Sequence, residues 1–160
     1  MPRFTLETIV VRLLTERKLT LALAESCTGG GIANRITNVP GASKCFLGGV
    51  VVYSNAAKQK FLGVRAATLA RHGAVSELVA RAMAEGARKK FGADFALAAT
   101  GIAGPTGGTK RKPVGTVFLA LTGARGTMVE RKRYSCGREQ FKALTARRAL
   151  TMLRAQLVRA

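Results

Sequence analysis

Two glycine-rich segments, each directly after a short apolar run, constrain the fold of this chain more than any other feature. The segment Glu25–Gly31 follows the run Thr20–Ala24, and the segment Thr100–Gly108 follows the run Phe95–Ala99. A buried strand that ends in such a turn places backbone N–H groups at the carboxyl end of a sheet, where α/β proteins collect their ligands. The two segments therefore predict an α/β fold with a ligand site at one edge of its sheet.

Hydrophobic periodicity predicts helices between and around these strands. Helices are expected over residues 4–17, from the first glycine-rich turn to about 38, from 54 or 55 onward with Lys58 in the helix, over 66–72, over 76–91 and from about 138 onward. Strands are expected over residues 20–24, 46–53, 95–99, 114–121 and 127–134, the second of them buried and the last two forming an antiparallel pair. This order favours a three-layer α/β/α fold with a mixed sheet.

Length and composition are those of one compact domain, which we expect to span residues 1–160. The chain is 48% hydrophobic and 22% charged, values typical of globular proteins. No apolar run approaches the ~20 residues that a membrane-spanning helix needs. Glu7 and Arg12 interrupt the apolar region that a signal peptide would have. We therefore expect a cytoplasmic protein with no membrane association.

Cysteine and histidine usage argues against a metal site and a disulfide framework. Cys27, Cys45 and Cys136 are widely spaced and form no CxxC pair, and His72 is the single histidine. We expect neither a metal nor a cofactor. A serine–histidine–acid triad would have to use His72.

The charge balance favours anionic partners. The chain has 27 Lys and Arg against 8 Asp and Glu, a formal net charge of +19, which attracts phosphates, nucleotides or nucleic acid. With 2 Tyr and no Trp, it offers few stacking platforms for nucleic acid, and it contains no helix-turn-helix or similar motif. Nucleic acid binding is thus possible but weak.

Ser26, Tyr53 and Lys58 are candidates for catalysis. Ser26 lies at a strand-to-helix turn that can hold a hydroxyl exposed beside amide donors, and a lysine of lowered pKa can act as its base. A hydrogen-bonded Tyr53 could relay the proton. Alternatively, Ser26 or Thr28 caps the next helix, Lys58 belongs to a solvated face and Tyr53 packs at a strand end. Cys27 is a rival nucleophile or a small buried apolar residue.

The second glycine-rich segment suits the close approach of an anion to the backbone. Thr100, Gly101 and Gly104 lie within it, and it contains neither a Walker loop nor a dinucleotide-binding fingerprint. The alternative interpretation is a mobile loop. The basic residues Lys110–Lys112, which follow this segment, are expected to form a charged rim around it.

Five motifs in order resemble the CinA C-terminal domain family, known as nicotinamide-nucleotide amidohydrolase or NMN deamidase. They are Ala24-Glu25-Ser26-Cys27-Thr28-Gly29-Gly30, Val52-Tyr53-Ser54-Asn55 with Lys58, His72-Gly73-Ala74-Val75-Ser76-Glu77, Thr100-Gly101-Ile102-Ala103-Gly104-Pro105 and Lys112-Pro113-Val114-Gly115-Thr116-Val117. The resemblance covers nearly the whole chain. It implies hydrolysis of the carboxamide of nicotinamide mononucleotide (NMN) to nicotinate mononucleotide and ammonia, in pyridine nucleotide salvage and without a metal.

The resemblance also implies roles for individual residues. Ser26 would be the nucleophile, Lys58 the general base and Tyr53 its partner in proton transfer. Substrate contacts would come from Thr28, Gly29, Gly30, Asn55, Thr100, Gly101 and Gly104. The resemblance further implies NMN or a related phosphorylated amide as the substrate, and a homo-oligomer is expected.

Two features depart from the family pattern. Members often show Gly-Asp-Arg and then a second arginine on the C-terminal helix, whereas this chain has Cys136-Gly137-Arg138 and then Lys142. If that helix position binds the substrate phosphate, lysine keeps the charge but loses the bidentate fork. The second departure is the net charge of +19. It keeps open the alternative of a non-catalytic, basic nucleotide- or DNA-binding competence or damage-inducible protein.

Overall fold

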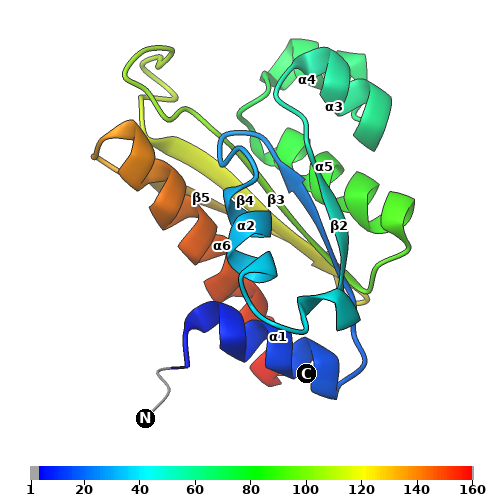
Figure 1. Cartoon of the computed structure of the whole chain (residues 1–160). Coiled ribbons are helices and arrows are strands. Elements are labelled where there is room, and N and C mark those ends of the chain that lie inside the picture. Colours follow the sequence, from blue (N-terminus) through cyan, green and yellow to red (C-terminus); the bar gives the residue numbers. More distant parts are fainter. Residues whose placement is uncertain (1–3, 160) are drawn as a thin grey trace.

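A computed structural model describes residues 4–159 of the chain. One five-stranded sheet lies between two layers of helices (Figure 1). The strands are β1 (Leu21–Glu25), β2 (Phe46–Val51), β3 (Phe95–Gly101), β4 (Thr116–Gly123) and β5 (Gly126–Arg133). The helices are α1 (Leu6–Glu16), α2 (Gly31–Thr37), the short 3₁₀ turn η1 (Ala42–Lys44), α3 (Asn55–Leu62), α4 (Ala66–His72), α5 (Glu77–Phe91) and α6 (Arg138–Arg159). The predicted three-layer α/β/α fold is confirmed.

The sheet is mixed, with strand order β2-β1-β3-β4-β5. β1 runs parallel to both β2 and β3, β4 is antiparallel to β3, and β5 is antiparallel to β4. The carboxyl ends of β1, β2 and β3 consequently meet at one edge of the sheet, at the top of Figure 1. Both glycine-rich segments begin there, as the sequence predicted.

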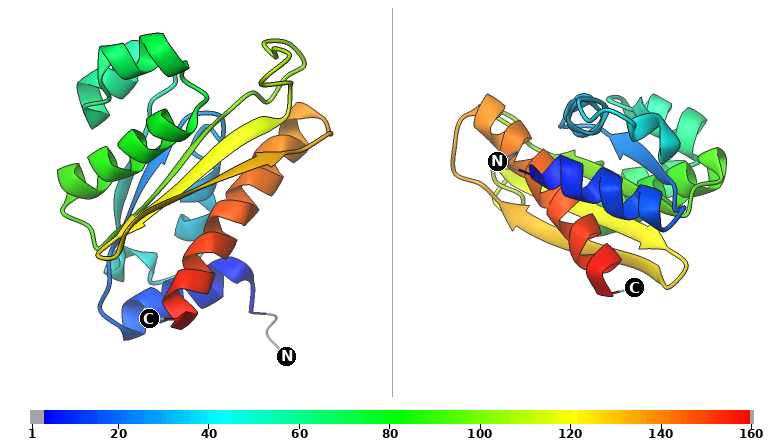
Figure 2. Two further views of the ribbon diagram at one scale, coloured as in Figure 1. Left: turned by 180° about the vertical axis from the view of Figure 1, so that it is seen from behind. Right: turned by 60° about the horizontal axis from the view of Figure 1, so that its bottom comes forward.

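Alternating leucine and alanine decide how the helices pack on the sheet. In β1, Leu21 and Leu23 face the core under α1, α2 and α6, whereas Ala22 and Ala24 face the core under α3, α4 and α5. Successive side chains of a strand point to opposite faces. The alanine face accommodates α5 closely, and Figure 2 shows α5 on one face with α1 and α6 on the other.

Serine and threonine caps define the starts of three helices. The side chains of Thr5, Ser54 and Ser76 accept a hydrogen bond from the backbone N–H three residues on and begin α1, α3 and α5. Such caps satisfy amide groups that have no partner within the helix. They confirm the helix starts expected near residues 54 and 76.

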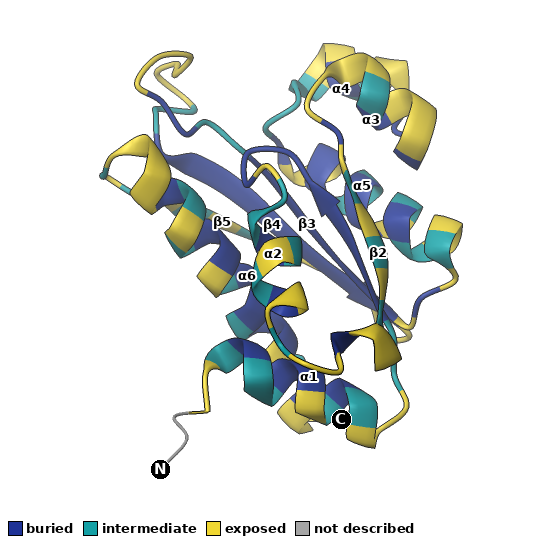
Figure 3. Ribbon diagram, viewed as in Figure 1, coloured by how far each residue is buried: buried dark blue, intermediate teal, exposed yellow. Residues whose placement is uncertain are grey.

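One predicted strand is wrong in its environment and its length. β2 was expected to be buried over residues 46–53, but it is an edge strand with alternately half-buried and exposed residues, and it ends at Val51 (Figure 3). Its apolar composition resembles that of a central strand, yet its position in the sheet leaves one side unpaired. Tyr53 therefore lies in the loop after β2.

The described residues contain neither a candidate membrane span nor a candidate metal cluster. No helix within residues 4–159 is long and apolar enough to cross a membrane. Over the same residues, no three or more His, Cys, Asp and Glu side chains lie close enough together to hold a metal ion.

Candidate active site

Lys58 is buried although lysine ammonium groups are almost always exposed. It lies on α3, the residue is 1% exposed, and it ranks among the largest fully buried side chains of residues 4–159. Ser54 caps the start of α3, and Gly63 ends the helix in a left-handed conformation. This short, capped helix directs one lysine inward, toward the end of β1.

The amine of Lys58 contacts the side chain of Ser26. The oxygen of Ser26 lies 3.1 Å from Lys58 Nζ, and its backbone N–H donates to the Ala99 carbonyl oxygen at 3.0 Å, so it lies directly beyond the paired ends of β1 and β3. The side chain is 8% exposed. The solvated-face interpretation of Lys58 is therefore wrong.

Two backbone carbonyl groups orient the lysine. Lys58 Nζ donates to the carbonyl oxygen of Val52 at 2.8 Å and lies 3.5 Å from that of Tyr53. Burial lowers the pKa of Lys58 because a charged ammonium loses its hydration there. A neutral Lys58 amine can donate its two N–H groups to these carbonyl oxygens. Its lone pair can then accept a proton from the third neighbour, the Ser26 hydroxyl. The arrangement can remove a proton from Ser26.

Glu25 organises the turn on the opposite face of β1. Its buried carboxylate accepts hydrogen bonds from the Thr28 hydroxyl at 2.6 Å and from the backbone N–H groups of Ile32 and Ala33 at 2.9 and 3.0 Å. The N-cap residue of α2, Gly30, has no side chain for this task. Neither Ser26 nor Thr28 caps α2, contrary to the alternative interpretation, because Glu25 does so from the strand.

One cavity contains most of the predicted site. It has a volume of about 280 Å³. The residues that line it are Ser26, Cys27, Tyr53, Lys58, Ala74, Val75, Thr100, Gly101, Ile102, Ala103, Gly104, Thr106, Gly107 and Arg138. The Thr100 hydroxyl donates to the Ala74 carbonyl oxygen at 2.9 Å and joins the second glycine-rich loop to the segment before α5.

The remaining predicted residues lie elsewhere. Thr28, Gly29, Gly30 and Lys142 line a neighbouring open hollow of about 480 Å³ between α2 and α6. Asn55 is the exposed first residue of α3 and lines neither space. The first glycine-rich turn thus separates two spaces, with Ser26 facing one and Gly29 facing the other.

Tyr53 and Arg138 lie at the cavity in a way that the sequence did not predict. Tyr53 lines the cavity, but its hydroxyl accepts a hydrogen bond from Arg138 Nη2 at 2.9 Å, and Lys58 approaches only its backbone carbonyl. Arg138, at the start of α6, was not among the predicted site residues. Two features of the sequence could have singled it out. Arg138 lies three residues before the apolar pattern of the C-terminal helix, and it belongs to the Cys136-Gly137-Arg138 segment, where the chain departs from the family pattern.

Cys27 is a poor nucleophile beside Ser26. Burial raises the pKa of its thiol to about 12, so the reactive thiolate is absent near neutral pH. Cys27 belongs to the buried core under α2 and α6. This environment matches the small buried apolar residue of the sequence analysis.

Comparison with known proteins identifies the family. The family model described as CinA C-terminal domain matches residues 3–157. The chain belongs to the CinA C-terminal domain family. A CinA-like protein of Geobacter sulfurreducens is 55% identical over 156 residues, and one of Syntrophus aciditrophicus is 53% identical over 154. These alignments cover 98% and 96% of this chain but 38% and 37% of the relatives.

Solved CinA structures share the whole fold. A CinA superfamily protein from Klebsiella pneumoniae superposes with a TM-score of 0.93 at 38% identity and covers 97% of both chains. The competence/damage inducible protein CihA from Agrobacterium tumefaciens has a TM-score of 0.90 at 42% identity, with 94% of both chains covered. The five-stranded sheet that carries Ser26 is therefore the CinA fold.

Proposed function

We propose that this CinA domain is an amidohydrolase that converts NMN, or a related phosphorylated amide, to the corresponding acid and ammonia. The observation that carries the proposal is the buried Lys58 amine, 3.1 Å from the Ser26 hydroxyl oxygen and held by backbone carbonyl groups. Burying a lysine is costly, and in this position it supplies the base that a nucleophilic serine needs.

The first half of the reaction forms an acyl-enzyme. Ser26 Oγ attacks the carboxamide carbon while its proton passes to Lys58 Nζ. The tetrahedral intermediate then expels the amide nitrogen, which takes the proton from Lys58 and leaves as ammonia. Ser26 now carries the acyl group as an ester, and Lys58 is neutral again.

The second half regenerates the enzyme. A water molecule attacks the ester carbonyl as Lys58 accepts its proton. Collapse of this intermediate breaks the bond to Ser26 Oγ, which recovers a proton from Lys58, and the carboxylic acid departs. General acid–base steps of this kind contribute roughly 10²–10⁴-fold to rate. The cycle consumes one water and needs no metal ligand.

The cavity dimensions suit part of a mononucleotide. A volume of about 280 Å³ is slightly below the ~300–1,000 Å³ typical of ligand sites. On this proposal the aromatic amide enters the cavity to reach Ser26, and the phosphate lies toward its opening. Of the cationic residues of α6, Arg138 lines this cavity and Lys142 lines the neighbouring hollow.

The test is ammonia release from NMN by purified wild type, Ser26→Ala and Lys58→Ala. Both variants should lose at least about 10³-fold in kcat, because nucleophile and base act as a unit. Lys60→Ala, which removes an exposed lysine from the same helix as Lys58, is the matched control and should retain activity within about threefold. Circular dichroism spectra of the variants test whether they are folded.

Two results would contradict the proposal. A fully active Ser26→Ala would exclude the acyl-enzyme. A wild type with no turnover of NMN would leave another amide substrate or the basic binding module, and DNA affinity that falls steeply with salt would support the latter.

A further inference from the structure

A second pocket lies at the end of the sheet opposite to Ser26. It has a volume of about 520 Å³ and is formed where β3 begins, beside the β4–β5 turn and the last turn of α6. Figure 2 shows this turn and the end of α6 far from the glycine-rich loop that follows β3. We call this space the basal pocket. Its lining includes the apolar residues Phe95, Leu121 and Met128 and the cationic residues Arg88, Arg125 and Arg159.

The floor of the basal pocket is apolar and contains an aromatic ring. Leu121 and Met128 face each other across the β4–β5 ladder, so their side chains lie on the same side of the sheet. The ring of the buried Phe95 packs against Gly123, where an added Cβ would lie 2.7 Å from Phe95 Cε1. Met128 continues the apolar lining to the surface, where it is 51% exposed. A phenyl ring and a polarizable thioether together suit contact with a flat aromatic group.

Three guanidinium groups line the basal pocket without an acidic partner. Within residues 4–159, no ion pair joins Arg88, Arg125 or Arg159 to a carboxylate. Arg88 Nε donates to the backbone carbonyl oxygen of Asp94 at 3.0 Å, which holds this guanidinium in place. The Asp94 carboxylate also lines the pocket, but its Oδ2 accepts from the N–H and the hydroxyl of Thr20 at 2.8 and 2.9 Å. The pocket therefore keeps an excess of positive charge.

The two kinds of lining define the chemistry of a ligand. The apolar floor gives no favourable contact to a bare inorganic anion, and an uncharged ring would leave the guanidinium groups without a counter-charge. Ligand sites typically have volumes of ~300–1,000 Å³ and combine apolar walls with a few polar groups. The basal pocket, at about 520 Å³, meets both conditions.

We propose that the basal pocket is a second ligand site, which binds an organic anion with a flat aromatic ring and a phosphate or carboxylate group. The ring packs on Phe95 and Met128, and Arg125 and Arg159 bind the anionic group. Guanidinium groups match the oxygen atoms of phosphate and carboxylate in pairs. The basal pocket shares no lining residue with the Ser26 cavity, so the proposal does not depend on the amidohydrolase function.

The test is a titration of the isotope-labelled protein, followed through its backbone amide signals by NMR. Adenosine monophosphate supplies a ring with a phosphate, and indole-3-acetate supplies a ring with a carboxylate. Adenosine and inorganic phosphate supply the two parts separately. At least one aromatic anion should bind with a Kd of about 1 mM or tighter, the scale expected for ligands of this size, and the separate parts should bind about tenfold more weakly. The signals of Gly123, Gly126 and Met128 should shift and saturate.

Two substitutions at surface positions of the β4–β5 hairpin test the two kinds of lining. Arg125→Ser removes an exposed guanidinium and should raise the Kd by about fivefold or more, as expected for a lost charge-assisted hydrogen bond. Met128→Glu replaces an apolar contact with a negative charge and should raise the Kd by about tenfold or more. The amide spectra of both variants also report whether they are folded.

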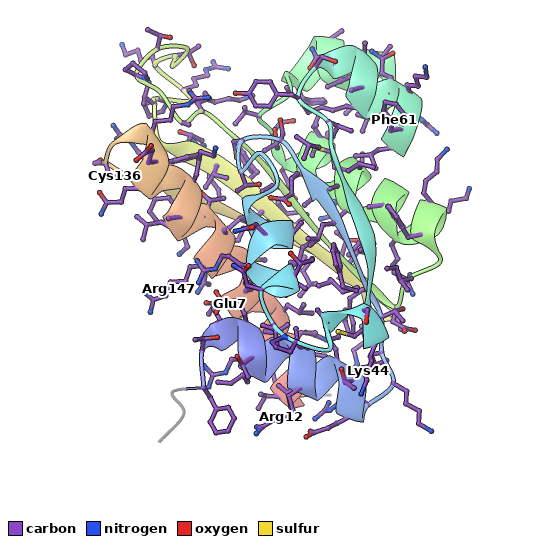
Figure 4. The ribbon with its side chains drawn as sticks, in the orientation of Figure 1. Glu7, Arg12, Lys44, Phe61, Cys136 and Arg147 are labelled. Atoms are coloured by element: carbon purple, nitrogen blue, oxygen red, sulfur yellow. The ribbon has the colours of Figure 1, made fainter. Side chains whose placement is uncertain are left out.

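Two matched controls separate binding in the pocket from general attraction to a basic protein. Lys90→Ser removes an exposed positive charge near the end of α5, two residues beyond Arg88. Arg147→Ser removes one from an exposed position of α6, far from the β4–β5 turn (Figure 4). Each should change the Kd by less than about twofold, because salt screens exposed charges that do not touch the ligand.

Several outcomes would overturn the proposal. If inorganic phosphate binds as tightly as the aromatic anions, the ring contributes nothing and the attraction is that of a charged surface. If the signals that shift belong to Gly101 and Gly104, the anion lies in the Ser26 cavity. Equal affinity of wild type, Arg125→Ser and Met128→Glu, or no binding of either aromatic anion at millimolar concentration, would show that the basal pocket is not a ligand site.

Discussion

Burial of a single lysine is the residue-scale feature on which the site depends. Lys58 exchanges hydration for three oxygen neighbours, those of Ser26, Val52 and Tyr53. The net effect of burial is a lowered pKa, so the neutral, basic form becomes more accessible near neutral pH. Burial of this lysine therefore costs stability and at the same time favours the neutral amine that the proposed function requires.

The free energy of unfolding should reveal this loss as a pH dependence. Because burial lowers the pKa of Lys58 below its ordinary value of 10.5, the unfolded chain binds this proton more tightly, and stability rises with pH between the two pKa values. We expect wild type to gain stability relative to Lys58→Met as pH rises through that window. Urea unfolding of both proteins at several pH values measures the difference.

Lys60→Met is the control for this experiment, because it removes an exposed lysine from the same helix. A difference between wild type and Lys58→Met that stays constant with pH would show that Lys58 does not titrate differently on folding.

At the scale of elements, close packing between α3 and α5 holds Lys58 in place. A Cβ added at Gly86 of α5 would lie 2.1 Å from the Leu62 carbonyl oxygen at the end of α3. The backbone at the end of α3 therefore packs directly against Gly86, and there is no room for a side chain between the two helices. Glu25 likewise holds α2 in place, because its carboxylate caps that helix from the end of β1.

Gly86→Ala should therefore destabilise the protein and impair the site together. Overpacking costs about 1–3 kcal/mol, and the helix propensity of alanine returns up to ~1 kcal/mol. We expect a net loss of about 1–2 kcal/mol in the free energy of unfolding and a lower kcat for NMN, because displacement of α3 moves Lys58 from Ser26. Chemical unfolding and steady-state kinetics measure the two effects.

Gly137→Ala is the matched control, since an added Cβ there meets no atom within 4 Å. Equal stability of the Gly86 and Gly137 variants would show that α3 and α5 adjust without strain.

At the scale of the whole molecule, basic residues far outnumber their carboxylate partners. With 27 Lys and Arg and 8 Asp and Glu, several cations bind backbone carbonyl groups, and Arg81 does so alongside an ion pair with Glu77. Lys112 donates to His72, Arg131 to Arg111 and Arg81 to Thr127. These contacts fasten the loop after β3 and the edge strand β5, but they do not remove the repulsion of a net charge of +19.

Salt should stabilise the folded protein by screening this repulsion. The Debye length falls from about 30 Å at 0.01 M to about 3 Å at 1 M salt, so we expect the urea midpoint to rise with sodium chloride concentration. Sodium sulfate at equal ionic strength distinguishes screening from anion binding. A midpoint that falls with added chloride would contradict dominant self-repulsion.

The sequence alone determined the local features of this protein. Periodicity, glycine and serine caps located the helices and strands to within a few residues, because helix capping and side-chain alternation depend on neighbours in the chain. Motifs and resemblance also pointed to Ser26, Lys58 and Thr100. The roles predicted for these residues await the experiments above.

Only the tertiary structure decided which residues meet. Ser26 and Lys58 are 32 positions apart, and Tyr53 and Arg138 are 85 apart; their contacts follow from strand order and from the seating of α3 and α6. The same strand order places the apolar β2 at an edge of the sheet, and it brings Glu25 to the start of α2, where its carboxylate caps the helix. Local patterns fix the conformation of a segment, whereas its partners depend on which segments the folded chain brings beside it.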